Sequence, residues 1–256
     1  MAQKERLSYI RKTIKEEKKV SVSELSKEYG VTEETIRRDL EKLENEGFVT
    51  RTYGGAVLNM EKITENIDYL RREQHNYEEK AIIGELAASV IPMKATIGAD
   101  ASSTVMAALK CLRNYSNVTV LTNSIPAILE FNQSELNIIS TGGVVNKNTY
   151  SMQGNVVRRN LSDYYVDIIL TSCKALDIDG GIFDSNEEEA ELKKILMERG
   201  EKIILLADHT KFNKMAFVKV LGFDKLDMVI TDREPSKEWK TLFKEKGIKL
   251  LYPGSK

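Results

Sequence analysis

The chain has 256 residues, of which 41% are hydrophobic and 30% are charged, and its 38 basic and 39 acidic residues leave a formal net charge of −1. This composition is typical of a globular protein and excludes an intrinsically disordered chain. The charge balance also excludes nucleic-acid binding through bulk positive charge, so any such surface must come from the placement of basic residues on one face.

Cellular location can be inferred from what the sequence lacks. No apolar run approaches the ~18–20 residues of a membrane span, and the opening MAQKERLSYI has no apolar signal-peptide core. The two cysteines, Cys111 and Cys173, have the spacing of neither a disulfide framework nor a zinc site. We therefore expect a cytoplasmic protein with no membrane partner, no metal and no cofactor.

The N-terminal part of the chain predicts three helices. Apolar spacing indicates the first over residues 4–17. The sequence SVSE at residues 21–24 is a capping box that starts a second helix, and Gly30 ends that helix. Thr32 caps a third helix that runs to Gly47. Two helices joined by a glycine-containing turn indicate a helix-turn-helix.

The third helix has one apolar and one polar face. Ile36, Leu40 and Leu43 form the buried stripe, and Arg37 and Arg38 lie away from it. Arginine reads guanine edges in the major groove, whereas threonine and lysine mostly contact phosphates or methyl groups. A strand and a glycine turn follow, which predicts a β-hairpin wing that carries Arg51 near its tip. The candidate DNA-binding residues are Ser21, Thr32, Thr35, Arg37, Arg38, Lys42, Arg51 and Tyr53. The alternative is a charged three-helix unit with no role at DNA.

Two motifs in this region resemble the DeoR family of bacterial transcriptional regulators. TIRRDL stands at residues 35–40 on the third helix, and the Arg-x-x-Gly-Gly-Ala wing runs from Arg51 to Ala56. Tyr53 takes the place where the family more often carries histidine. The resemblance implies a winged helix-turn-helix DNA-binding domain over residues 1–57.

Residues 58–76 have much charge and no clear period, which predicts a linker. Arg71 and Arg72 within it are interpreted as solvated surface, with contact to the DNA backbone as the alternative. Residues 77–256 then alternate short apolar strands with amphipathic helices. This alternation indicates an α/β domain with a parallel sheet covered on both faces. One helix is predicted to start at the capping box Ser185–Glu188 and to run to Gly200.

Polar side chains recur at the carboxyl ends of the predicted strands, where ligands of such sheets bind. Small hydroxyl residues at helix N-termini offer N–H groups and the positive end of the helix dipole, which suits phosphate or carboxylate. Their coincidence at successive strand ends predicts a small anionic ligand such as a sugar phosphate. The candidate effector-binding residues are Asp100, Ser102, Ser103, Thr104, Thr122, Asn123, Ser124, Gly142, Gly143, Lys174, Asp208 and Lys211.

The resemblance to the DeoR family extends over this second domain. Its ordered landmarks are DASST at 100–104, TNS at 122–124, Gly142-Gly143, EAELK at 189–193 and ADHTKF at 207–212. Ser102 replaces the family's usual glycine, and the stretch from Ser172 to Asp177 replaces a Gly-Ala-rich one. The resemblance implies an α/β sensor domain related in fold to ribose-5-phosphate isomerase, which binds a phosphorylated sugar effector.

Together these patterns predict a repressor of a sugar-utilisation operon that binds double-stranded operator DNA as a homo-oligomer, dimer or tetramer. Two alternatives remain at this point. One is a sugar-phosphate isomerase-like enzyme, although the carboxylates of residues 177–189 fit a helix N-terminus. The other is a DNA-binding protein whose second domain only oligomerises.

Overall fold

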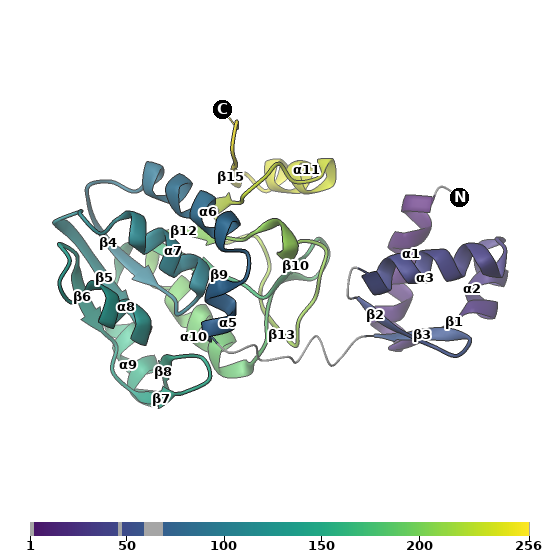
Figure 1. Cartoon of the computed structure of the whole chain (residues 1–256), viewed down its shortest axis with the longest axis horizontal. Helices are drawn as coiled ribbons and strands as arrows, with labels where there is room; N and C mark the ends of the chain where they lie inside the picture. Colours follow the sequence, from purple (N-terminus) through teal and green to yellow (C-terminus); the bar gives the residue numbers. More distant parts are fainter. Residues whose placement is uncertain (1–2, 46–47, 59–68, 256) are drawn as a thin grey trace. The chain divides into compact units, whose positions relative to one another are not determined.

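The structure is a computed structural model that describes residues 3–45, 48–58 and 69–255. The contacts between residues divide the chain into two compact units, Met1–Glu65 and Asn66–Lys256 (Figure 1). The boundary falls inside the segment 58–76 that the sequence predicts to be a linker. Residues 59–68 of that segment lie outside the described residues.

The N-terminal unit combines three helices with a small antiparallel sheet in the strand order β1-β3-β2. Its elements are α1 (Gln3–Glu17), β1 (Lys19–Ser21), α2 (Val22–Tyr29), α3 (Glu33–Asn45), β2 (Val49–Thr52) and β3 (Gly55–Leu58). The three expected helices and the wing are present, whereas β1 was not predicted. The expected end of the third helix, Gly47, lies outside the described residues.

Local signals explain the helix boundaries in this unit. Ser21 Oγ accepts a hydrogen bond from the Glu24 backbone N–H at 3.3 Å, and Gly30 ends α2 in the left-handed region at a φ of 62°. Both features confirm the predicted start and stop. Gly55 is required for a different reason, because a Cβ there would lie 2.1 Å from the Val20 carbonyl oxygen across the β1–β3 pair.

The second unit is built on a seven-stranded sheet with the order β15-β14-β12-β9-β4-β5-β6, in which every neighbouring pair is parallel. Its strands are β4 (Lys94–Ala99), β5 (Asn117–Thr122), β6 (Asn137–Ser140), β9 (Val166–Ser172), β12 (Gly200–Leu206), β14 (Met228–Ile230) and β15 (Lys249–Leu251). The expected parallel-sheet α/β architecture is confirmed.

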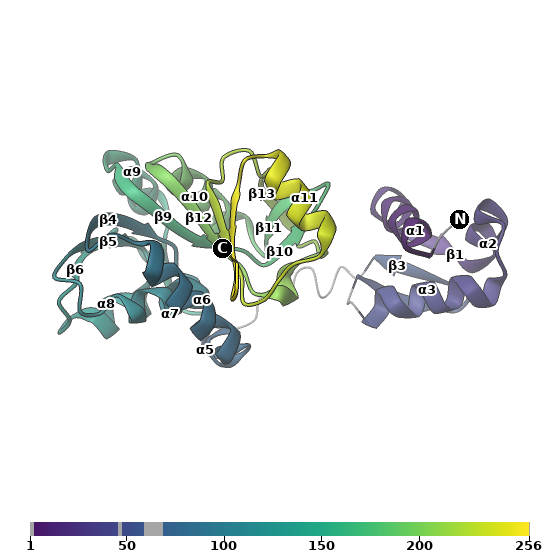
Figure 2. The same cartoon turned by 90° about the horizontal axis from the view of Figure 1, so that it is seen from above.

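Helices cover both faces of this sheet (Figure 2). One face packs against α6 (Tyr77–Val90), α7 (Ser103–Cys111) and α8 (Ile125–Phe131). The other packs against α9 (Asn155–Asp163), α10 (Glu187–Met197) and α11 (Lys237–Glu245). Among the described residues, no helix is long and apolar enough to pass through a membrane.

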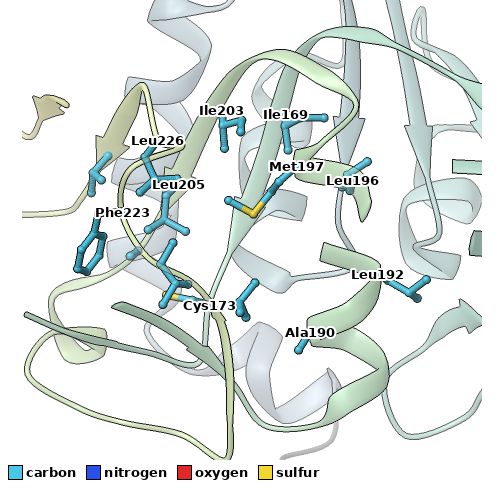
Figure 3. Packing of buried hydrophobic residues seen from close by; sticks show 14 of the residues in the cluster. Ile169, Cys173, Ala190, Leu192, Leu196, Met197, Ile203, Leu205, Phe223 and Leu226 are labelled. Atoms are coloured by element: carbon cyan, nitrogen blue, oxygen red, sulfur yellow. The ribbon is translucent and has the colours of Figure 1, made fainter. Parts of the chain in front are cut away.

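Alternation along the strands divides the core into two apolar clusters. In β9, Ile168 and Leu170 belong to the cluster under α6 to α8, whereas Ile169 belongs to the cluster under α9 to α11. In β12, Ile204 and Ile203 divide in the same way. Figure 3 shows part of the second cluster, where residues of β9, α10 and β12 meet. β9 and β12 are apolar at successive positions because both faces of the sheet are buried under helices.

Several short elements were not predicted from the sequence. They are α5 (Tyr69–Gln74), the hairpin of β7 (Val144–Asn146) and β8 (Ser151–Gln153), the sheet of β10 (Ala175–Asp177), β11 (Gly181–Asp184) and β13 (Val218–Leu221), and the 3-10 turn η1 (His209–Lys211). α5 belongs to the second unit. The second half of the expected linker is therefore part of the second unit.

The expected start and end of α10 need correction. Asn186, not Ser185, is the N-cap residue, and its side chain accepts from the Glu189 backbone N–H at 2.8 Å. The helix ends at Met197, and Gly200 is the first residue of β12. Both serine and asparagine are good caps, so the sequence pattern alone did not distinguish the two neighbours.

Candidate functional site

The exposed face of α3 carries the basic residues predicted to read DNA. Arg37 Nη2 lies 2.6 Å from Glu33 Oε2 and Arg38 Nε lies 3.3 Å from Glu34 Oε1, with the arginine side chains 47% and 74% exposed. Lys42 is exposed one turn further on. Exposed pairs of this kind contribute little free energy. Both guanidinium groups can therefore exchange glutamate for a phosphate or a base edge.

Hydroxyl side chains of this unit form hydrogen bonds at the N-termini of α2 and α3. Thr32 Oγ1 accepts from the Thr35 backbone N–H at 3.3 Å and lies 2.9 Å from Thr35 Oγ1. Ser21 Oγ caps α2 and lies 2.9 Å from Ser23 Oγ. Contact of Ser21, Thr32 and Thr35 with DNA stays a prediction.

The wing presents one aromatic and one basic side chain. Tyr53 is fully exposed in the turn between β2 and β3, next to Gly54 with its φ of 82°. Arg51 is exposed within β2, opposite Ala56, and its backbone N–H donates to Glu44 Oε1 at 3.0 Å. The tip of the wing is thus Tyr53 rather than Arg51.

A buried ion pair, which the sequence analysis did not find, joins α1 to α3. Arg6 Nε donates to Asp39 Oδ2 at 2.6 Å, and the two side chains are 6% and 0% exposed. Asp39 follows Arg38 directly in the sequence but lies on the buried face of α3. The pair therefore fixes the rotation of α3 that turns Arg37 and Arg38 toward solvent.

In the second unit, the strand order of the sheet reverses between β4 and β9. β5 and β6 follow β4 on one side, and β12, β14 and β15 follow β9 on the other. Ligands of open α/β sheets bind beyond the carboxyl ends of the strands at such a switch point. A ligand site is therefore expected where β4 and β9 end.

Asp100 joins the ends of these two strands. Its Oδ2 accepts from the Ser172 backbone N–H at 2.9 Å and from Thr171 Oγ1 at 2.8 Å, and its Oδ1 accepts from the Ser102 backbone N–H at 2.9 Å. Burial raises the pKa of Asp100, but Lys193 and these hydrogen bonds outweigh burial and lower it below its usual range. The carboxylate is therefore ionised and braces both strands.

Lys193 reaches the same point from α10. Its Nζ lies 3.1 Å from Asp100 Oδ2 and 2.7 Å from Asp184 Oδ2, and it donates to the Ser172 carbonyl oxygen at 2.7 Å. Burial lowers the pKa of Lys193, but the two carboxylates outweigh burial and raise it. The three donors of the ammonium group thus have three acceptors, which fixes its position.

Glu189 lies one turn before Lys193 on the same face of α10. Burial, assisted by Asp184, raises the pKa of Glu189 to about 7, whereas Lys193 and Arg72 act in the opposite direction. The Glu189 carboxyl group therefore changes its charge close to neutral pH.

A narrow crevice lies beside these groups, with about 20 Å³ of free space inside it and about 420 Å³ when the open solvent around it is included. Its polar lining combines side chains from α5, the β4–α7 loop, the end of β5 and α10, namely Arg72, Asp100, Ser102, Asn123, Glu189 and Lys193. Ser102 Oγ accepts from the Val105 backbone N–H at 3.1 Å and caps α7. The positive end of the α7 dipole therefore lies at the crevice. Asp100, Ser102 and Asn123 are the predicted effector residues that line it.

Four other predicted effector residues lie in the same strand-end loops but are buried among protein partners. Ser103 Oγ donates to the Arg72 carbonyl oxygen at 3.3 Å, and Thr104 is 3% exposed. Thr122 Oγ1 accepts from the Ser124 backbone N–H at 3.0 Å, and Ser124 caps α8. Direct contact of these four residues with an effector stays a prediction.

Gly142 and Gly143 follow β6 with φ values of 63° and 116°. A Cβ at Gly143 would lie 2.5 Å from Val157 Cγ2 and 2.7 Å from the Gln153 carbonyl oxygen. The close approach that requires glycine here is to α9 and β8. Neither glycine lines the crevice.

Lys174, Asp208 and Lys211 also lie outside the crevice lining. The Lys174 backbone N–H donates to the Phe183 carbonyl oxygen at 3.0 Å, which holds this residue in the turn before β10. Lys211 Nζ lies 3.7 Å from Asp208 Oδ2 at the end of β12. Burial raises the pKa of Asp208, but Lys211 and the hydrogen bonds from Thr210 outweigh burial and lower it.

Three residues of the crevice were not among the predicted site residues: Arg72, Glu189 and Lys193. Glu189 and Lys193 stand in the EAELK landmark, and their spacing of four places them on one face of a helix. That spacing was the available signal. Arg72 gave no signal, because the segment around it has no period and was interpreted as a solvated linker.

Among the described residues, one group has the donors of a metal site: Glu79, His209 and Asp232, whose ligand atoms lie within 4.8 Å of one another. Asp232 Oδ2 already lies 2.9 Å from both His209 Nδ1 and Arg233 Nε, and Arg233 Nη2 lies 3.7 Å from Glu79 Oε1. The Arg233 guanidinium group thus supplies the positive charge that a cation would bring.

Both units match models of one family. The DeoR-like helix-turn-helix domain matches residues 6–62, and the DeoR C-terminal sensor domain matches residues 75–233. The chain belongs to the DeoR family of transcriptional regulators. The two units of the chain are therefore the DNA-binding and sensor domains of one regulator.

Relatives along nearly the whole length agree with this assignment. The chain is 40% identical to the uncharacterized HTH-type transcriptional regulator YulB of Bacillus subtilis strain 168 over 83% of this chain and 82% of the relative. It is 34% identical to the HTH-type transcriptional repressor GlcR of the same organism over 98% of this chain and 96% of the relative. It is 33% identical to the HTH-type transcriptional regulator GolR of Listeria innocua over 95% of this chain and 96% of the relative. The chain is therefore a DNA-binding regulator, and the isomerase-like enzyme is set aside.

Solved structures resemble the chain only in part. Ribose 5-phosphate isomerase A from Methanocaldococcus jannaschii is 17% identical and covers 54% of this chain and 55% of its own, with a TM-score of 0.41. Nothing about activity follows from a likeness of this extent.

Proposed function

We propose that this DeoR-family regulator represses a sugar-utilisation operon and that a phosphorylated sugar bound in the crevice sets its affinity for operator DNA. The observation that carries the proposal is the position of the crevice, which lies at the switch point of the sheet beside the N-terminus of α7. Helix N-termini at such points bind anions through backbone N–H groups and the helix dipole.

The chemistry of the crevice supports a ligand with an anionic group and a small polar body. Arg72 brings positive charge, and Ser102 and Asn123 offer polar atoms. Leu161 and Leu192 add an apolar wall against which the C–H face of a sugar can pack.

The exposed arginines of α3 and the wing supply the other half of the mechanism. A symmetric homo-oligomer, dimer or tetramer, would place several such helices on half-sites about one helical turn, or a multiple of it, apart. The effector changes DNA binding only if it has different affinities for the DNA-competent and DNA-released states.

Thermal unfolding of the full chain tests the effector. The panel contains glucose 6-phosphate, fructose 1-phosphate, fructose 6-phosphate, ribose 5-phosphate and glycerol 3-phosphate, each with its unphosphorylated parent as control. Saturation at about 100 times Kd stabilises by about 2.7 kcal/mol, which raises Tm by several degrees in a domain of this size. A shift with one phosphate and not with its parent supports the proposal. No shift with any compound supports a second domain that only assembles subunits.

The effect on DNA is measured next. Operator sequences are selected by the full chain from a random duplex library, and their affinity is measured with and without the phosphate that raised Tm. Weaker binding in its presence is expected for a repressor released by its effector. Tighter binding would contradict effector-released repression.

A further inference from the structure

Arg72 is half-buried, and two of its three guanidinium nitrogens lack hydrogen-bond partners in the described part of the chain. Its Nε and Nη2 atoms are buried, and neither has a partner among the described residues. The side chain lines the crevice and lies over the Tyr69 ring at 5.6 Å. A guanidinium group cannot lose its proton in a protein, and a buried donor without a partner is unfavourable. The side chain is thus prepared for an anionic acceptor that enters the crevice.

Glu189, whose carboxyl group interacts electrostatically with Arg72, provides only part of a counter-charge for it. Glu189 lines the same crevice, and burial raises its pKa to about 7. Near neutral pH a large fraction of Glu189 is therefore uncharged. Asp100 remains ionised, and Lys193 already pairs with both Asp100 and Asp184. The crevice thus contains an arginine whose charge is not matched by a dedicated carboxylate.

The backbone of Arg72 is held in place by polar side chains of the sensor core. Lys80 Nζ of α6 donates to the Arg72 carbonyl oxygen and, at 2.6 Å, to the His75 carbonyl oxygen. Ser103 Oγ, at the start of α7, donates to the Arg72 carbonyl oxygen at 3.3 Å. We name Lys80 and Ser103 the α5 anchor.

α5 is also the first described element of the sensor unit after the DNA-binding unit in the chain. The helix is six residues long, too short to be stable without tertiary contacts. Tyr69 is 1% exposed, and its backbone N–H donates to the Asn148 carbonyl oxygen at 3.1 Å. Tertiary contacts of Tyr69, of Arg72 with the α5 anchor, and of Glu73 with Lys110 Nζ at 3.1 Å therefore hold this short helix in order.

We infer that Arg72 binds the anionic group of the effector and thereby couples occupancy of the crevice to the order of α5, the segment that leads back to the DNA-binding unit. The inference rests on the proposed function. It adds that Arg72 is the residue that binds the phosphate and that α5 is the element whose order changes on binding. An anion in the crevice completes the hydrogen bonding of Arg72 and fixes α5 from its side-chain end, while the α5 anchor fixes it from the backbone.

Matched arginine variants test the binding step. Arg72→Gln and Arg71→Gln are made in the full chain, because Arg71 is the exposed neighbour on the same helix. Calorimetry measures the Kd of whichever sugar phosphate of the panel gives the largest Tm shift, and inorganic phosphate serves as the minimal probe. Arg72→Gln is expected to weaken binding about 10- to 100-fold, as for loss of a charge-assisted bidentate contact. Arg71→Gln is expected to change Kd less than twofold.

Hydrogen–deuterium exchange tests the coupling step. The amides of residues 69–75 are expected to exchange about tenfold more slowly with saturating sugar phosphate in the wild type and in Arg71→Gln. In Arg72→Gln, saturated at a correspondingly higher concentration, this protection is expected to be lost. Lys80→Met, which removes the main donor of the α5 anchor, is expected to exchange fast in this segment with and without the ligand.

Each outcome separates the inference from the proposed function. Equal sugar-phosphate affinity in wild type and Arg72→Gln overturns the inference and leaves the proposed function standing. Weaker binding with unchanged protection of residues 69–75 overturns the coupling. If neither inorganic phosphate nor any sugar phosphate binds to the wild type, the proposed function and the inference both fail. Far-UV circular dichroism of each variant shows whether the sensor domain has kept its fold.

Discussion

The recognition helix and the sensor crevice both use charged side chains, but they hold them in opposite ways. On α3, Arg37 and Arg38 are largely exposed and each is paired with a glutamate one turn earlier on the same helix. In the crevice, Lys193 is buried between Asp100 and Asp184, which come from other parts of the chain. One surface is local and loosely held, whereas the other is assembled over long distances and rigid.

The difference follows from what each surface must do. A surface that binds DNA has to exchange its internal partners for phosphates and base edges, so weak exposed pairs suit it. A site for one small ligand must exclude other compounds, and this requires groups held in fixed positions by burial and full hydrogen bonding. Substitutions should therefore affect mainly binding in the first region and mainly stability in the second.

The largest effect is expected from Lys193→Met. The change leaves Asp100 and Asp184 buried without their counter-charge, and breaking a buried pair typically destabilises by about 3–5 kcal/mol. Urea unfolding followed by the fluorescence of Trp239, the single tryptophan, which lies in the sensor core, measures the loss. Lys194→Met is the control at the next position. Equal losses in the two variants would contradict the role of the buried pairs.

Arg37→Ala and Arg38→Ala are expected to have the opposite profile. Each should weaken operator binding by about 1–3 kcal/mol, as for a lost base contact, but change the free energy of unfolding by only about 0.5 kcal/mol. Fluorescence anisotropy with the selected operator measures binding, and circular dichroism measures unfolding.

Glu33→Gln and Glu34→Gln are the matched controls for these arginines, because they remove the partner and keep the guanidinium group. Operator affinity should be retained in both. If the arginine variants bind the operator as wild type does, the assignment of α3 as the recognition helix is wrong.

Arg51→Ala on the wing is expected to have a smaller effect that does not depend on sequence. A lost phosphate contact lowers the slope of log K against log salt by about 0.9. Titrations of specific and random DNA at several salt concentrations measure this slope, with Thr52→Ala as the neighbouring control. A changed sequence preference at an unchanged slope would show that Arg51 contacts bases instead.

The smallest effect is expected from pH in the crevice. As the pH rises through about 7, Glu189 gains a negative charge beside Arg72, Lys193, Asp100 and Asp184, so affinity for a sugar phosphate should fall a few-fold. The ionisation of the phosphate changes Kd with pH equally in the wild type and in Glu189→Gln. The variant should therefore lack only the part of the pH dependence that comes from Glu189. Identical pH profiles of Kd for the two proteins would contradict this role.

The same pKa shift has a consequence for stability. The folded state raises the pKa of Glu189 from 4.5 to about 7, so between these values the folded chain binds more protons than the unfolded chain. The contribution of Glu189 to the free energy of unfolding is complete below about pH 4.5 and is lost as the pH rises to about 7. Urea unfolding of wild type and Glu189→Gln at pH 5 and pH 7.5 measures the difference.

The sequence predicted what local rules determine. The capping box at Ser21 and the C-cap at Gly30 depend on residues within a few positions of each other. The parallel sheet was predictable for a similar reason, because strands buried on both faces are apolar at every position.

The rest depended on distant partners. α5 has six residues and no apolar period, so its burial through Tyr69 could not be inferred. The EAELK spacing placed Glu189 and Lys193 on one helix face, but their meeting with Asp100 follows from the strand order. The strands of the hairpin and the small sheet, at three or four residues each, are too short to show alternation.

The burial of Cys173 provides an internal reporter for the sensor domain. The thiol packs in the apolar cluster of Figure 3, and burial raises its pKa to about 12. Because only the thiolate reacts with alkylating agents, Cys173 should be labelled only when the domain opens, whereas the exposed Cys111 reacts in the closed form. The ratio of the two labelling rates would measure opening of the sensor core inside living cells, without an introduced probe.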